Sequence, residues 1–196
     1  MRISRPALLA ATIAPLVLGC GRTTTGAAPA AGPRPVTRVL PLTGLFLLEM
    51  SGVPPEDTSA TFPTGTAHRV ILRHGPPDHA VFVELTFAAK TFAAEGSPDS
   101  VTVTLHPHPG VYGVDVTTTV PPGPGGLICF KYPVHFAAPV AATARYGTSG
   151  SFEEALAVAI QREDGSYGLL ESERPAWDNL QAPLRSAGTY LVVAPR

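Results

Sequence analysis

Apolar and polar positions alternate in short runs along most of the chain, and proline or glycine separates one run from the next. In the stretch SVTVTLHP, Val101, Val103 and Leu105 fall on one side, while Thr102 and Thr104 fall on the other. A period of two is typical of a β-strand with one buried face. Similar runs recur about every eight to twelve residues, which predicts an all-β fold: a single antiparallel β-sandwich of immunoglobulin-like type.

Two segments in the second half carry more specific local signals. The pair Asp164-Gly165 stands between two apolar runs and predicts a tight hairpin. Upstream, Ser151 and Glu154 have the spacing of a capping box, and good helix formers follow them. Because the hairpin needs a strand entering it, we expect a helical turn at 151–155 and a strand at 156–162. The preceding run, VAATARYG, is predicted to be a further strand.

The first twenty residues depart from this β pattern. Arg2 and Arg5 precede a largely apolar run, Ala7–Leu18. Its length and its basic start are those of a signal peptide. A membrane-spanning helix needs about 20 apolar residues, so the run is too short to be one. The segment therefore predicts that the chain is exported.

The end of that segment, Val17-Leu18-Gly19-Cys20, resembles the lipobox of bacterial lipoproteins, which has an aliphatic, a variable and a small residue before cysteine. The resemblance implies that the Cys20 thiol receives a diacylglycerol, that the Gly19–Cys20 bond is cut, and that the new amino group takes a further acyl chain such as palmitate. Leu18 departs from the Ala, Ser or Thr of many members. Gly21, in place of Asp, implies sorting to the outer membrane. The alternative is an ordinary secretory signal that is cut elsewhere.

The lipobox interpretation divides the chain into three parts. Residues 1–19 are a signal peptide, residues 20–36 are the lipidated cysteine and a flexible Pro/Ala tether, and residues 37–196 are the β-sandwich domain. Two or three acyl chains hold a protein stably at a membrane, so the expected location is the bacterial cell envelope, at the outer membrane or facing the periplasm. The covalent lipid is the only cofactor expected. Cys129 then lacks a disulfide partner and is expected to be a buried, small hydrophobe.

The composition of the chain limits the classes of partner that it is expected to bind. The chain has 14 basic and 15 acidic side chains, a formal net charge of −1, and no basic cluster. Nucleic-acid binding depends on phosphate neutralisation by clustered Lys and Arg, and we expect none. The 22 prolines and 19 glycines are scattered between apolar runs, where they mark turns. The membrane, reached through the lipid, is the expected partner, with an envelope protein or a glycan as a further candidate.

Short motifs in the carboxy-terminal half resemble bacterial extracellular β-sandwich modules related to the ZU5 family. They are Phe130 to Val134, the acidic pair Glu153-Glu154 before a strand, the pair Asp164-Gly165, and the closing Gly188-Thr189-Tyr190 strand. The upstream Gly-Gly opening and the IP-x-G-A element of ZU5 are missing. The resemblance implies a sandwich in an extracytoplasmic setting, and it brings no catalytic residue with it.

The histidines raise one alternative function. His106 and His108 lie two apart in LHPHPG, and His74 and His79 lie in RHGPPDHAVF. If the two loops met at one end of the sandwich, these side chains could bind zinc or copper, which need three or four converging ligands. The same histidines are equally explained as polar turn residues. The alternative to a non-catalytic envelope module is therefore a metal-binding envelope lipoprotein.

Catalytic signals are weak. The chain contains neither a Gly-x-Ser-x-Gly elbow nor a Ser-x-x-Lys motif, and its acidic pairs have the pattern of solvated turns. We therefore expect no enzyme and assign no catalytic residue. Trp177, the only tryptophan, stands in an apparent loop, ERPAWDNLQAP, and is a candidate ligand-binding residue. We favour the alternative that it plugs one end of the sandwich core.

Overall fold

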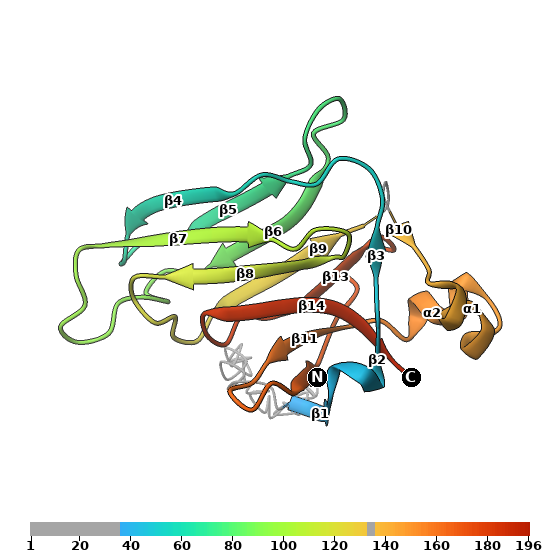
Figure 1. Ribbon diagram of the computed structural model, residues 1–196. Helices are drawn as coiled ribbons and strands as arrows, with labels where there is room; N and C mark the ends of the chain where they lie inside the picture. The colour runs from blue at the N-terminus through green and yellow to red at the C-terminus, as the bar shows by residue number, and fades with distance from the viewer. Residues whose placement is uncertain (1–35, 133–135) are drawn as a thin grey trace, which may run out of the picture. The chain divides into compact units, whose positions relative to one another are not determined.

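The computed structural model describes residues 36–132 and 136–196, whose strands form two antiparallel sheets packed as a sandwich (Figure 1). The proposed signal peptide, Cys20 and nearly all of the tether lie outside the described residues. The larger sheet has eight strands, and in it β2 (Leu45–Leu47) pairs with the end of β14. The other seven follow the order β1 (Val36–Leu40), β12 (Tyr167–Leu170), β11 (Ala157–Gln161), β14 (Gly188–Pro195), β8 (Gly113–Thr118), β7 (Ser100–Pro107) and β4 (Thr58–Pro63).

The second layer is a four-stranded sheet, and shorter elements stand beside the two layers. The order of the sheet is β13 (Asn179–Pro183), β9 (Gly126–Lys131), β6 (Val81–Phe87) and β5 (His68–Arg73). The shorter elements are the pair β3 (Glu49–Met50) and β10 (Phe136–Ala137), the 3-10 turn η1 (Leu42–Gly44), and the helices α1 (Val140–Tyr146) and α2 (Ser149–Glu154). The predicted all-β sandwich is confirmed.

Strand β7 has the alternation that its sequence predicts. Val101, Val103 and Leu105 are fully buried, and the threonines between them lie on the outer face. There, Thr102 and Thr104 bond to hydroxyls of β4, at 2.8 Å to Thr61 and 3.0 Å to Ser59. The hydroxyl ladder joins the two strands on the side where no apolar packing is available.

Strand β6 departs from simple alternation because of a bulge. Leu72 of β5 pairs with Val83, but the next residue, Arg73, pairs with Val81, so Phe82 is the extra residue. A bulge lets two successive side chains turn toward the same side. Phe82 and Val83 are accordingly both fully buried.

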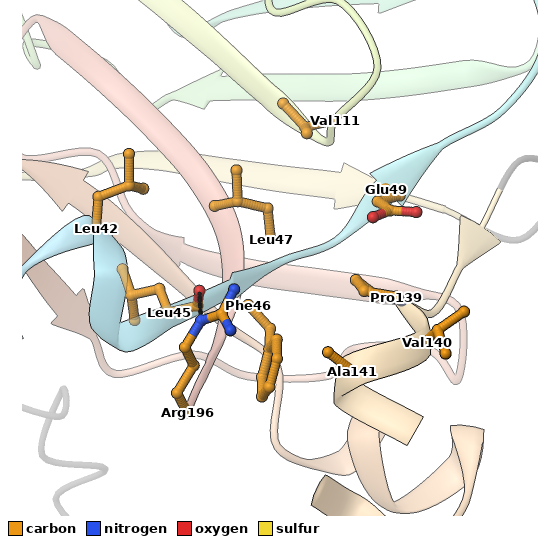
Figure 2. A pocket seen from close by; sticks show the side chains of 10 residues that line it. All are labelled: Leu42, Leu45, Phe46, Leu47, Glu49, Val111, Pro139, Val140, Ala141 and Arg196. Carbon is orange, nitrogen blue, oxygen red and sulfur yellow. Dashed lines mark hydrogen bonds between the residues drawn. The ribbon is translucent and has the colours of Figure 1, made fainter. Parts of the chain in front are cut away.

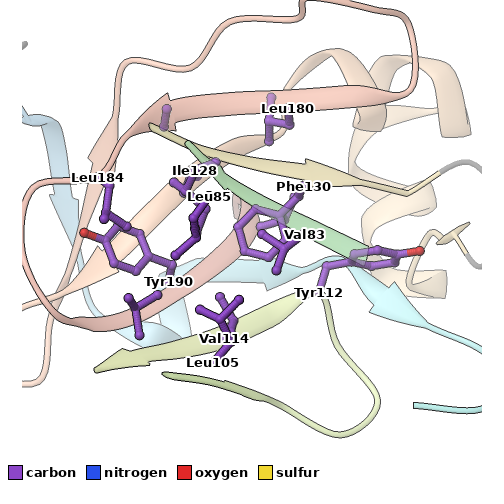
Figure 3. Packing of buried hydrophobic residues seen from close by; sticks show 14 of the residues in the cluster. Val83, Leu85, Leu105, Tyr112, Val114, Ile128, Phe130, Leu180, Leu184 and Tyr190 are labelled. Atoms are coloured by element: carbon purple, nitrogen blue, oxygen red, sulfur yellow. The ribbon is translucent and has the colours of Figure 1, made fainter. Parts of the chain in front are cut away.

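The core lies between the two sheets (Figure 3). Apolar side chains of β6, β9 and β13 face those of β7, β8 and β14, and the fully buried aromatics Tyr112 and Phe130 lie among them. Tyr190 closes one side: its hydroxyl accepts from the backbone N–H of Arg185 (3.1 Å) and donates to the carbonyl of Ser186 (2.8 Å). This is the arrangement of a tyrosine corner, in which a strand tyrosine bonds to backbone a few residues upstream.

The local predictions for residues 140–167 had mixed outcomes. The Asp164-Gly165 hairpin is present: Gly165 has φ +77°, a value that glycine adopts without strain, and Arg162 N–H bonds to Ser166 O at 2.8 Å. The predicted helical turn followed by a strand is also present, as α2 and β11. The cap of α2 is different, however. Thr148 Oγ1, and not Ser151, accepts the capping bond, from the N–H of Ser151 at 3.0 Å.

The strand predicted for VAATARYG is wrong. Residues Val140–Tyr146 form the helix α1, which begins after Pro139 and ends at Gly147, with φ +79°. Three alanines make this run a good helix former, and a short apolar run does not distinguish helix from strand by periodicity. Among the described residues, no helix has the length and apolar character needed to cross a membrane.

Candidate functional site

The four candidate histidines occupy different environments. His74 is buried (3% exposed), and its ring stands edge-on to the rings of Phe82 and Tyr112, so it is part of the aromatic core. A packed ring of this kind is unsuited to serve as an exposed metal ligand. His79 lies in the β5–β6 turn with φ +50°, and its carbonyl accepts a bond from Arg73 Nη1.

His106 and His108 stay on the outside of the larger sheet, and each donates to a carboxylate. His106 Nδ1 lies 2.7 Å from Asp57 Oδ2, and His108 Nε2 lies 2.9 Å from Asp115 Oδ1. Thr189 Oγ1 also donates to Asp115 Oδ1, at 2.6 Å. His106 is the cross-strand neighbour of Asp115. The result is a polar row across β7, β8 and β14 that extends to Asp57, ahead of β4.

Asp115 is the best-connected carboxylate of this row. Partial burial acts to raise its pKa, but the hydrogen bonds from Thr189 and His108 and the nearby imidazoles outweigh burial, so the pKa lies below its ordinary value. Within the described ranges, no three or more His, Cys, Asp or Glu side chains come close enough to hold a metal ion. The four candidate histidines therefore do not converge into the metal site that was the alternative interpretation.

Cys129 agrees with its prediction. It is a free thiol in β9 and is buried (8% exposed). Burial raises the pKa of the thiol to about 11, and the positive charge of Lys131 only partly opposes this. The thiol is therefore protonated at neutral pH, which is the condition of a packing residue and not of a nucleophile.

An open groove of about 580 Å³ lies between η1, β2 and the start of α1 (Figure 2). Arg196 crosses it, with Nε donating to Leu45 O at 2.8 Å and the guanidinium 4.3 Å from the centre of the Phe46 ring. The remaining lining is aliphatic apart from Glu49, so it suits an apolar group better than a polar one. These residues are Leu42, Leu47, Val111, Pro139, Val140 and Ala141. With Arg196, the lining comes from four separate stretches of the chain, which is why no local sequence signal predicts the groove.

Trp177 is exposed, so the prediction that it plugs the core is wrong. Its side chain is 76% exposed, in the loop between β12 and β13. The buried residue Tyr132 lies against this loop: its hydroxyl donates to Glu153 Oε1 at 3.0 Å and stands 3.5 Å from Trp177 O. Burial raises the pKa of the Tyr132 hydroxyl to about 12, and Glu153 adds to this while Arg174 opposes it.

The loop that carries Trp177 is fixed by many bonds. Glu173 and Gln181 exchange two backbone hydrogen bonds of 2.8 Å, and Arg174 bonds to the Tyr132 hydroxyl and to the carbonyl of Glu153. Tyr132 N–H bonds to Asp178 O at 3.2 Å. The tryptophan is thus presented to solvent on an ordered frame, which suits a binding role. No protein-family model, curated protein or solved structure that was compared with the chain matches it.

Proposed function

We propose that this chain is a bacterial cell-envelope lipoprotein, in which a diacylglyceryl group on Cys20 holds a non-catalytic β-sandwich at the membrane, most simply the outer membrane. One observation carries the proposal: Cys20 follows a small residue directly at the end of an apolar, signal-like run. The sandwich serves there as a binding or structural module. The relation to ZU5-like extracellular modules belongs to the same proposal.

The position of the first strand supports this arrangement. β1 begins at Val36, and residues 21–35, between Cys20 and that strand, contain no bulky apolar side chain. In this proposal the Pro/Ala segment serves as the tether. It separates the acyl chains in the bilayer from the folded domain, so that the domain is free to meet a partner.

The chain's two cysteines allow a matched test. Cells that express the full chain are labelled with palmitate, and the Cys20→Ser and Cys129→Ala variants are compared with the parent. We expect label in the parent and in Cys129→Ala, and an unlabelled, unprocessed precursor for Cys20→Ser. Label retained by Cys20→Ser, or absent from the parent, contradicts the anchor.

A thiol count gives a second, independent readout. Lipidation consumes the Cys20 thiol, so the purified parent should show one reactive thiol in denaturant, that of Cys129. The native protein should show none on the same time scale, because the Cys129 thiol is buried and its pKa is about 11. Two thiols in denaturant would mean that Cys20 is unmodified.

A further inference from the structure

The placement of the aromatic residues sets Trp177 apart. The chain has eight Phe, five Tyr and one Trp, and all fourteen lie in the described residues. The thirteen Phe and Tyr rings are buried in the core or packed against it. Trp177, the largest ring, is 76% exposed. Trp177 is therefore the one residue among the Phe, Tyr and Trp of the chain whose ring faces solvent.

The exposure is not a result of a loose loop. The backbone beside Trp177 is held by the Glu173–Gln181 pair, by Asn179 N–H bonding to Ala176 O at 3.2 Å, and by Tyr132 N–H bonding to Asp178 O. A loop whose backbone is ordered before binding loses less entropy when it binds, which favours its use as a binding site. Tryptophan is also among the residue types most enriched at such anchors.

The polar residues that follow Trp177 in the chain indicate which class of ligand the ring could bind. Asp178 and Asn179 follow Trp177 directly in the chain, so a carboxylate and an amide belong to the same turn as the indole. Both are partly exposed. Together they offer acceptors and a donor on the turn that carries the indole, and no hydrogen bond between described residues uses either side chain.

The local charge excludes some classes of ligand. Residues 171–178 carry three carboxylates and one arginine, and that arginine, Arg174, is engaged with Tyr132 and Glu153. The net negative charge of this segment disfavours phosphate groups, so an anionic lipid surface or a nucleic acid is a poor partner for it. A neutral ligand with one apolar face and an edge of hydroxyl groups does fit.

We propose that Trp177 is the platform of a carbohydrate site, on which the apolar C–H face of a neutral sugar ring stacks while Asp178 and Asn179 bond to its hydroxyl groups. The inference rests on the proposed role of the sandwich as a binding module, and it does not depend on the lipid anchor. The ligand class is a neutral oligosaccharide. Anionic glycans are disfavoured by the same carboxylates that repel phosphate.

Fluorescence of Trp177, the only tryptophan of the chain, can report binding directly. Because no other indole is present, a change in tryptophan emission can come only from Trp177. The full chain, in a zwitterionic detergent without a sugar headgroup, is titrated with neutral oligosaccharides of glucose and of N-acetylglucosamine. We expect a saturable change in emission with at least one of them.

Variants then locate the site by calorimetry with the oligosaccharide that binds. Trp177→Ala should lower affinity by about tenfold or more, and Trp177→Phe by less, since a smaller ring still stacks. Asp178→Asn should weaken binding several-fold. Val39→Ala, an exposed apolar residue in β1, is the matched control and should leave affinity unchanged.

Three outcomes overturn the inference. They are the absence of a saturable response to any of these oligosaccharides up to millimolar concentration, a response to anionic vesicles or arginine peptides instead, and equal sugar affinity in Trp177→Ala. Palmitate labelling reports separately on the anchor. A labelled protein that binds no sugar therefore contradicts the carbohydrate site alone, and a sugar-binding protein without label contradicts the anchor alone.

Discussion

The aromatic interior of the sandwich and the β12–β13 loop use the same kind of side chain in opposite ways. In the interior, the Phe82 ring stacks on Tyr112 with centroids 5.1 Å apart and meets Phe130 edge-on at 6.0 Å. In the loop, Trp177 stands in solvent on a frame of hydrogen bonds. The interior rings contribute stability through burial and ring contacts, whereas the loop ring contributes almost none.

This difference separates two roles that one residue type can have. Burying a large apolar side chain stabilises a fold by about 1.5–3 kcal/mol. The chain forgoes that gain at Trp177, although it realises it at its other aromatic positions. An exposed ring on an ordered loop is the observation from which we propose the sugar site. The predictions below measure this contrast, beginning with the largest expected effect.

Phe82→Ala tests the interior directly. The side chain is fully buried and touches the rings of His74, Tyr112 and Phe130, so its loss leaves a cavity among groups that cannot easily close it. We expect the free energy of unfolding to fall by about 3–5 kcal/mol, measured by urea denaturation. A loss below about 1 kcal/mol would show that the bulge at Phe82 is not packed as described.

Tyr190→Phe tests the corner that closes the core. The substitution keeps the ring but removes a hydroxyl that bonds to backbone groups of Arg185 and Ser186. These groups would then lose their partner inside the protein. We expect a loss of about 1–3 kcal/mol in unfolding free energy, by the same measurement. Tyr146→Phe, whose hydroxyl donates to Pro195 O at 2.6 Å from a partly buried position, is the matched comparison and should cost less.

The polar row around Asp115 should contribute less to the free energy of unfolding, and its contribution should depend on pH. Because the pKa of Asp115 in the folded state lies below its ordinary value, its contribution to stability is present above that ordinary value and is lost as pH falls through the lower, folded-state pKa. We expect Asp115→Asn to destabilise the protein near neutral pH, and the gap to the parent to shrink below about pH 3.9. The denaturation midpoints of the parent and of Asp115→Asn, measured across this pH range, test this. A difference between them that does not change with pH would mean that the hydrogen bonds alone, and not the charge, stabilise the polar row.

How much of the fold and of the candidate site could be predicted from the sequence depended on whether the residues involved lie close together along the chain. Alternation in β7 and the Asp-Gly pair act within a few residues, and both predictions are confirmed. The helix α1 was missed because its short apolar, alanine-rich run fits two structures. The groove joins β2, the turn before β8, α1 and Arg196, a combination that only the tertiary fold creates.

The failed prediction for Trp177 has a different cause. Tryptophan is highly buried on average, so a core position was the reasonable expectation for the only one in the chain. No pattern in ERPAWDNLQAP distinguishes a ring that turns inward from one that turns outward. The buried Tyr132 contacts this segment, with its hydroxyl 3.5 Å from Trp177 O, yet it lies 45 residues away along the chain. Local sequence does not reveal such a long-range contact.

Trp177→Ala should therefore have the smallest effect on stability of all these changes. The side chain leaves little buried area to lose, and the bonds that fix its loop come from backbone groups and from Arg174. We expect the free energy of unfolding to stay within about 0.5 kcal/mol of the parent. A loss as large as that of Phe82→Ala would place the indole in the core and end the contrast. An unchanged stability together with lost sugar binding would assign the two aromatic populations to two separate functions, one to folding and the other to recognition.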